Sequence, residues 1–393
     1  MKINSIFIII ALAVIGGVTF YTHKNGITSF SSLKESANLS YFIEDITYSN
    51  IESGLQLAGT LTVPHSTTPC PAIILVAGTG RHERNGTVKG HHELFTAIAD
   101  YLTGKGIAVL RYDKRGVGQS EGTFDTRLTS HDFASDVKAG LTYLKTRSEI
   151  DLNKIGLLGH SEGGLIVCMV ATESNDLAFL VLMAGAATTK IDDIVEQACM
   201  QLHADGATEE MIALDRKIRT KMLSIVHKKS DIEIADKLLH QVVGKYLTEL
   251  TPEQTAQAEL LAFETSQPFF EPQAPVYAIS KLNSEVMIQI FNSPWTRFLL
   301  SYDAIGALRK ITIPVAIING ESDFIVAEKI TTPIFEKNLI HAPYVAMVKI
   351  PKVNHFFETC KNGSMNEYGK TTEAISPIFL QVVGDQIKQM LKV

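Results

Sequence analysis

The chain has 393 residues, of which 45% are hydrophobic and 20% are charged, as in an ordinary α/β protein with a large core. Its formal net charge of −6 is small for this length, and no basic block could neutralise a nucleic-acid backbone. We therefore expect no nucleic-acid partner. The four cysteines lie far apart and lack metal-ligand spacing, so we expect neither a zinc site nor a dense disulfide framework.

The N-terminal residues differ from the rest of the chain. Lys2 precedes an uncharged, largely apolar stretch over 3–22, as in an export signal or a membrane anchor. No clear small-x-small cleavage site follows this stretch, which favours an uncleaved anchor. Residues 1–24 are therefore predicted to be a signal peptide or N-terminal anchor and residues 25–40 a linker. The protein is predicted to be exported and extracytoplasmic, with the membrane contacted only through this segment.

From residue 41 onward, short β-prone runs alternate with helical patterns. The predicted strands lie at 43–48, 56–63, 72–76, 107–112, 154–158, 179–183, 315–319 and 345–350. Helices are predicted to begin near residues 92 and 129, to follow Thr251, and to span 163–171, 211–226, 232–247 and 377–391. The first two strands are predicted to form an antiparallel hairpin. The later alternation predicts right-handed βαβ units, hence a mostly parallel eight-stranded sheet flanked by helices.

The alternation stops between residues 186 and 304, where helical patterns replace it. Thr251, Pro252 and Gln254 form a typical helix start within this region. We interpret 186–304 as a helical cap inserted into an α/β core, whose two parts are 41–185 and 305–393.

Two segments match the pattern Gly-x-Ser-x-Gly, at 159–163 and at 118–122. A nucleophile elbow must be a sharp turn between a buried strand and a helix, because only that turn exposes the serine oxygen above the sheet. Ser161 has this context, whereas Ser120 is followed by a polar loop. The sequence therefore predicts Ser161 as the nucleophile and Ser120 as a loop serine.

The other catalytic residues are predicted from chain order. In proteins with a nucleophile elbow the serine comes first, the acid second and the histidine last. Asp323 follows the strand at 315–319 and His355 follows the strand at 345–350. Glu321 is the alternative acid. The backbone N–H groups of Thr79 and Glu162 are the predicted oxyanion donors, with a plain turn residue as the alternative for Thr79.

Two aromatic residues of the insertion, Trp295 and Phe298, are candidates for a substrate pocket beneath the cap, and core packing explains them equally well. The charged run Arg111-Tyr112-Asp113-Lys114-Arg115 ends a predicted strand near the same sheet edge. We expect a structural ion-pair network there.

With these residues identified, the chain from about residue 43 resembles a bacterial branch of the α/β-hydrolase superfamily, related to esterases and serine aminopeptidase-like hydrolases. The segments that carry the resemblance are 73–80, 106–116, 159–164, 319–323 and 354–356. The resemblance implies Ser161 as nucleophile, His355 as general base and Asp323 as its orienting acid, with Thr79 and Glu162 at the oxyanion hole. One loop departs from the pattern, since 78–84 reads Gly-Thr-Gly-Arg-His-Glu-Arg instead of the usual Gly-Ser-Gly-Pro followed by acidic residues.

The function expected from the sequence is cleavage of small acyl esters through an acyl-enzyme intermediate, without metal or cofactor. An aminopeptidase or amidase that uses the same triad is the alternative within enzymes. A non-catalytic ligand-binding module with this fold is the alternative from another class. The sequence leaves the oligomeric state open.

Overall fold

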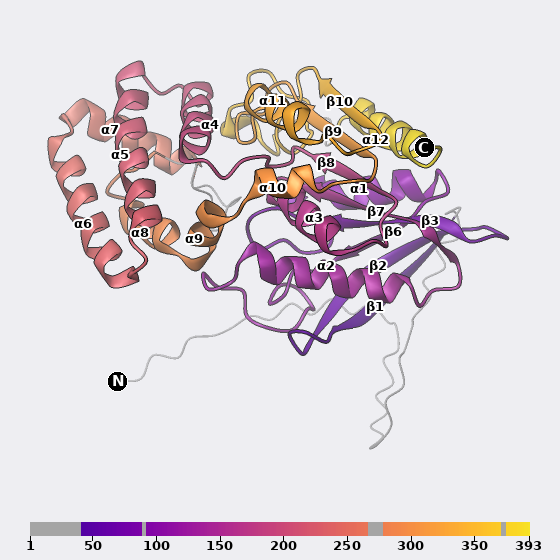
Figure 1. Cartoon of the computed structure of the whole chain (residues 1–393). Coiled ribbons are helices and arrows are strands. Elements are labelled where there is room, and N and C mark those ends of the chain that lie inside the picture. The colour runs from indigo at the N-terminus through magenta and orange to yellow at the C-terminus, as the bar shows by residue number, and fades with distance from the viewer. Residues whose placement is uncertain (1–40, 89–91, 266–277, 371–374) are drawn as a thin grey trace, which may run out of the picture. The chain divides into compact units, whose positions relative to one another are not determined.

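The computed structural model describes residues 41–88, 92–265, 278–370 and 375–393 (Figure 1). The predicted signal or anchor at 1–24 and the linker at 25–40 lie outside the described residues. None of the helices within the described ranges is long and apolar enough to cross a membrane.

Among the described residues, eight strands form one sheet in the order β1-β2-β6-β3-β7-β8-β9-β10 (Figure 1). Their bounds are β1 Tyr41–Asn50, β2 Leu55–Pro64, β3 Cys70–Val76, β6 Ala108–Tyr112, β7 Ile150–His160, β8 Phe179–Met183, β9 Val315–Gly320 and β10 Val345–Ile350. Strand β2 pairs antiparallel with both neighbours, and the remaining pairs are parallel. This confirms the predicted mostly parallel, eight-stranded sheet. A short hairpin of β4 (Thr87–Val88) and β5 (His92–Glu93) lies outside it.

Helices cover both faces of the sheet because alternate residues of the central strands point to opposite sides. Ile74 of β3 packs in one hydrophobic cluster and its neighbour Ile73 in the other. The first cluster is completed by α2 (Ser130–Leu144), α3 (Glu162–Glu173), α10 (Ala304–Arg309) and α11 (Glu328–Asn338). The second is completed by α1 (Leu94–Thr103) and α12 (Pro377–Met390). The parallel strands are thus buried on both faces, as their continuous apolar runs require.

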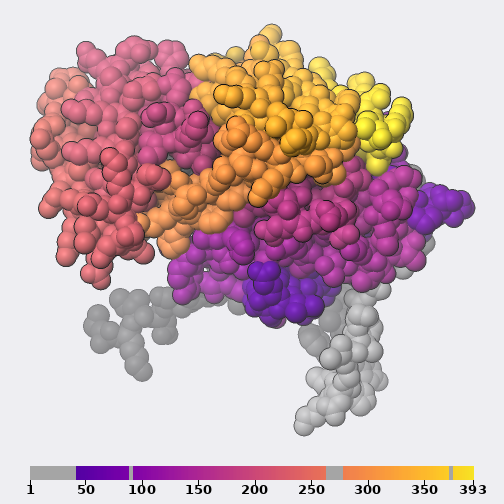
Figure 2. Space-filling model, in the orientation of Figure 1, coloured from indigo at the N-terminus to yellow at the C-terminus, as the bar shows by residue number. Residues whose placement is uncertain are grey.

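A helical insertion separates β8 from β9. Its helices are α4 Ile191–Ala204, α5 Glu209–Lys228, α6 Ile232–Glu249, α7 Pro252–Thr265, α8 Ser284–Asn292 and α9 Pro294–Ser301. They pack around a hydrophobic cluster of their own, which includes Met222 and Phe291. Figure 2 shows these helices as a continuous block, coloured from rose to orange.

Side-chain caps fix where the predicted helices begin. At the start of α7, the backbone N–H of Gln254 donates to Thr251 Oγ1 at 3.2 Å, and that of Thr251 donates to Gln254 Oε1 at 3.0 Å. At the start of α2, the backbone N–H of Thr129 donates to Asp132 Oδ2 at 2.8 Å. Each cap satisfies backbone N–H groups that have no partner within the helix.

Candidate active site

Ser161 lies at a sharp turn between the end of β7 and the start of α3. Its backbone has φ of 58° and ψ of −123°. A positive φ is energetically unfavourable for any residue that has a side chain. The turn is held from the neighbouring strand, because Ser161 N–H donates to Met183 O and Ala186 N–H donates to Ser161 O, both at 3.0 Å. The backbone strain is therefore maintained by the surrounding sheet.

Two glycines make room for this turn. A Cβ atom on Gly163 would overlap the carbonyl oxygen of Val76, so α3 can start this close to β3 only with glycine there. A Cβ atom on Gly78 would lie 2.7 Å from Ser161 Cβ. The loop after β3 therefore runs directly against Ser161.

The predicted acid and histidine are brought together at the same sheet edge. Asp323 follows β9, His355 follows β10, and both side chains are buried. His355 Nδ1 lies 2.8 Å from Asp323 Oδ2, while Asp323 Oδ1 accepts from the backbone N–H groups of Ile325 at 3.0 Å and Val326 at 2.9 Å. Since an ionised carboxylate only accepts, Nδ1 donates and Nε2 is left with its lone pair. The alternative acid, Glu321, is exposed.

The residue before Ser161 connects the turn to the histidine loop. His160 Nε2 donates to the backbone carbonyl oxygen of His355 at 2.9 Å, and the two rings are 4.7 Å apart. Burial and the nearby His355 lower the pKa of His160 well below its usual range, so its ring stays neutral. No role for His160 was predicted from the sequence. Its place inside the Gly-His-Ser-Glu-Gly motif was the only signal.

The side chain of Glu162 joins three parts of the chain beside Ser161. Its Oε2 accepts from Thr79 Oγ1 at 2.9 Å, and its Oε1 accepts from Ser130 Oγ at 2.5 Å and Trp295 Nε1 at 2.8 Å. The two residues predicted as oxyanion donors are therefore neighbours. Trp295 comes from α9, so this carboxylate also ties the helical insertion to the core.

A cavity of about 160 Å³ opens between Ser161 and the helical insertion. Its lining is mostly apolar and includes Leu165, Ala187, Ile194, Ala198, Leu223, Phe291, Leu299 and Val326, together with Ser161, Thr79, Glu162 and Trp295. Phe298 is not part of this lining. It stacks on Tyr302 at 5.6 Å and packs against the core, so only one of the two predicted aromatic residues faces the cavity.

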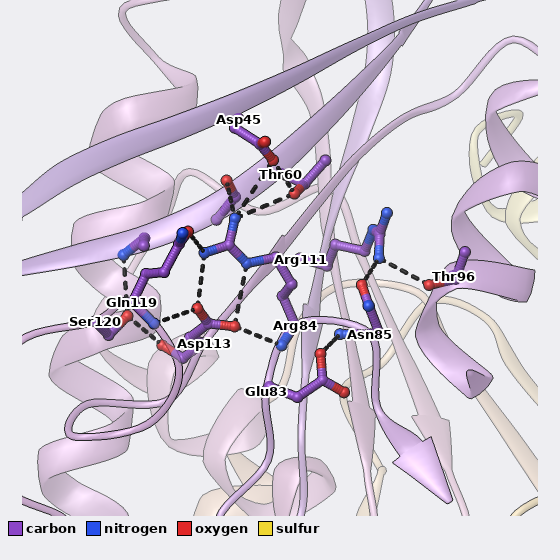
Figure 3. Close-up of polar contacts among 12 residues, drawn as sticks. Asp45, Thr60, Glu83, Arg84, Asn85, Thr96, Arg111, Asp113, Gln119 and Ser120 are labelled. Atoms are coloured by element: carbon purple, nitrogen blue, oxygen red, sulfur yellow. Dashed lines mark hydrogen bonds and ion pairs between the residues drawn. The ribbon is translucent and has the colours of Figure 1, made fainter. Parts of the chain in front are cut away.

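The second Gly-x-Ser-x-Gly segment lies in a structural loop (Figure 3). Ser120 Oγ donates to Asp113 O at 2.7 Å and accepts from the backbone N–H of Ala58 at 2.9 Å. Both sides of the hydroxyl are therefore engaged by backbone groups. The nearby Asp113 carboxylate binds Arg84, in an ion pair of 2.7 Å. No His, Cys, Asp and Glu side chains in the described parts of the chain gather into a group that could hold a metal ion.

Comparison with known proteins identifies the fold that carries this geometry. A family model described as serine aminopeptidase, S33, matches residues 86–258. The α/β hydrolase GrgF from Penicillium sp. sh18 superimposes with a TM-score of 0.51 at 18% identity, over 89% of this chain and 99% of GrgF. A Pyrococcus furiosus esterase superimposes with a TM-score of 0.50 at 15% identity, over 90% of this chain and 91% of the esterase. The chain therefore has the α/β-hydrolase fold.

Among curated proteins, esterase EstD of Thermotoga maritima is 31% identical over 169 residues, which are 42% of this chain and 39% of the esterase. The chain thus spans about two fifths of the length of this relative. Together, the family model and the esterase relative confirm the resemblance to the esterase and serine aminopeptidase-like branch of the α/β-hydrolases.

Proposed function

We propose that this protein is a serine hydrolase that cleaves small acyl esters through an acyl-enzyme intermediate. The observation that carries the proposal is the 2.8 Å contact between His355 and Asp323, linked to the strained Ser161 turn through His160. The apolar cavity beside Ser161 supplies a place for the acyl group.

The proposed mechanism gives each of these groups a role. Asp323 holds the proton on His355 Nδ1, so that Nε2 takes the hydroxyl proton of Ser161 while Oγ bonds to the substrate carbonyl carbon. The carbonyl oxygen becomes an anion, which the backbone N–H groups of Thr79 and Glu162 bind. His355 then gives its proton to the departing alcohol as the ester C–O bond breaks. Water attacks the acyl-enzyme with the same base and releases the acid.

The cavity favours an acyl group over an amino-acid residue. Among the described residues that line it, Glu162 is the one carboxylate, and its oxygens already accept from Thr79, Ser130 and Trp295. No other acidic group in this lining could bind the α-ammonium of an aminopeptidase substrate. A cavity of about 150 Å³ holds one benzene molecule, so acyl groups of roughly six carbon atoms or fewer should fit.

The test is hydrolysis of p-nitrophenyl esters from acetyl to decanoyl by the full chain, beside the matching anilides. We expect the highest kcat/KM between butanoyl and hexanoyl, slower anilide cleavage, and covalent labelling by a fluorophosphonate probe. Preferred cleavage of aminoacyl anilides would instead assign the aminopeptidase function. Folded protein that neither turns over an ester nor accepts the probe would support a binding module.

Trp295 should limit the length of the acyl group. Its side chain also borders a second cavity of about 30 Å³, lined by Phe124, Leu128 and Phe133. We expect Trp295→Ala to join the two cavities and move the preference towards longer acyl groups, because the volume of the lost indole becomes available to the acyl chain. Trp295→Phe removes the indole N–H but keeps most of the volume, so it should retain the wild-type preference. Equal chain-length profiles for both variants would contradict this role.

A further inference from the structure

The carbonyl groups of the loop after β3 are held by two side chains that can titrate. Lys114 Nζ donates to Gly78 O at 2.8 Å, and His82 Nε2 donates to Thr79 O at 2.7 Å. The peptide between Gly78 and Thr79 carries one of the proposed oxyanion donors. We infer that Lys114 is a positioning residue that directs the Thr79 N–H toward the Ser161 site. This inference rests on the proposed esterase function.

The planarity of the peptide bond links the two groups. In a trans peptide the carbonyl oxygen and the following N–H point to opposite sides, and the described chain has no cis peptide. When Lys114 fixes the carbonyl of Gly78, it therefore fixes the direction of the Thr79 N–H as well. His82 holds the next carbonyl in the same way, which prevents the loop from rotating at either peptide. Gly78 lies against Ser161, so a small rotation here moves the donor relative to the reacting oxygen.

The surroundings of Lys114 differ from those of its neighbours in the chain. Asp113 pairs with Arg84 at 2.7 Å, and Arg115 pairs with Asp136 at 2.8 Å, as the predicted ion-pair network requires. Lys114 is only 2% exposed, and its ammonium instead meets the Gly78 carbonyl and the face of the Phe133 ring, at 3.7 Å from its centroid. A buried ammonium is costly. A role in orienting the loop accounts for its presence.

The charge on Lys114 is sensitive to pH in the range where an esterase is assayed. Burial lowers its pKa to about 8, with Glu162 and Asp136 favouring the charged form and Arg115 opposing it. Burial, with the Lys114 charge, lowers the pKa of His82 to about 4, so His82 is neutral throughout this range. Lys114 is charged below pH 8 and loses its proton above it. A charged donor makes a hydrogen bond about twice as strong as a neutral one and polarises the peptide more.

The far end of the loop is anchored without Lys114 (Figure 3). Arg84 makes its ion pair with Asp113, and its backbone N–H donates to Asp113 Oδ1 at 2.8 Å. Arg111 binds Asn85 and Thr96 through the same guanidinium nitrogen. Replacing Lys114 should therefore change the orientation of the Gly78 peptide and leave the rest of the loop in place.

The first test is steady-state hydrolysis of the preferred p-nitrophenyl ester by Lys114→Met. We expect kcat to fall by about 10²-fold, near the lower end of what the loss of an oxyanion donor costs, with KM changed by less than about twofold. Affinity for a trifluoromethyl ketone, which forms a tetrahedral adduct with the serine, should fall by the same factor as kcat/KM. Lys138→Met is the matched control: Lys138 of α2 is partly exposed and pairs with Glu173 at 3.0 Å, so this variant should keep wild-type kcat.

The second test is the pH profile of kcat. The wild-type protein should lose activity as pH rises through about 8, because Lys114 becomes neutral. Lys114→Gln keeps an uncharged donor, so its lower kcat should show no decline in that interval. If Lys114→Met fails to fold, the pH profiles of Lys114→Gln and of the wild type still test the positioning role of Lys114.

The outcomes separate this inference from the function beneath it. If the wild-type protein cleaves no ester and takes no fluorophosphonate label, the proposed function fails. If the wild type is active and the folded Lys114 variants match it in kcat, ketone affinity and pH profile, only the inference fails, and Lys114 is a packing residue.

Discussion

Ser161→Ala is expected to abolish ester turnover and fluorophosphonate labelling while the protein stays folded. Loss of the nucleophile of a triad lowers kcat by about 10⁶-fold in a comparable enzyme, which for a slow ester leaves only background hydrolysis. The substitution removes one oxygen and keeps Cβ, so the strained turn and its backbone bonds to Met183 and Ala186 should persist. Initial rates with the preferred ester and a thermal melt of the same sample provide the measurement.

Ser120→Ala is the matched control, because it alters the same motif at a position that we assign to structure. Its hydroxyl bridges Asp113 O and the backbone N–H of Ala58, and leaving such buried groups unpaired costs about 1–3 kcal/mol. We expect a lower melting temperature and nearly wild-type kcat/KM in the folded fraction. Loss of activity in Ser120→Ala with retention in Ser161→Ala would reverse the assignment of the nucleophile.

The parts of this fold that follow strong local rules could be predicted from the sequence. Continuous apolar runs predicted β3 and β8 to within two residues at each end, because a strand buried on both faces leaves no room for polar residues. The strand-turn-helix context also separated Ser161 from Ser120. Chain order pointed to Asp323 and His355, which the structure places 2.8 Å apart.

Elements with weak local signals were not predicted. The hairpin of β4 and β5 has two residues in each strand, too few for a periodic pattern. Helix α11 contains Pro333 and few apolar residues, because only one of its sides packs on the sheet. Its apolar pattern was therefore too weak to predict a helix. Strand β10 lies at the sheet edge and is half exposed, yet it was predicted, because Val345, Val348 and Ile350 give this short run a strong strand preference.

Contacts between residues far apart in the sequence could not be predicted from local patterns. Trp295 and Glu162 are 133 positions apart, and the indole N–H donor that joins them depends on how α9 lies over the core. Phe298, one turn away on the same helix, packs on Tyr302 and the core instead. The charged run after β6 was predicted to form ion pairs, which holds for Asp113 and Arg115. Lys114 binds a carbonyl because the β3 loop, not an acidic side chain, lies opposite it.

Asp323→Asn should lower kcat by about 10⁴-fold, the loss seen when the buried acid of a serine protease triad is replaced in this way. The structure explains why the amide cannot substitute for the carboxylate. The N–H groups of Ile325 and Val326 both donate to Oδ1, so they would hold the amide oxygen there and turn the NH₂ group toward His355. Nδ1 would then accept, the proton would move to Nε2, and the ring could no longer take the proton of Ser161.

The effect of Asp323→Asn should depend on pH, and Glu321→Gln is its matched control. Activity of Asp323→Asn should recover partly at high pH, where the Ser161 hydroxyl can lose its proton without His355, and the profile of kcat against pH measures this. Glu321→Gln changes the exposed alternative acid and should leave kcat within about twofold of wild type. A large loss in Glu321→Gln with an active Asp323→Asn would show that the acid of the triad is Glu321. Because His355 and Asp323 are in contact at 2.8 Å, we expect the two variants to differ in activity. Equal activity would show that neither carboxylate orients the histidine.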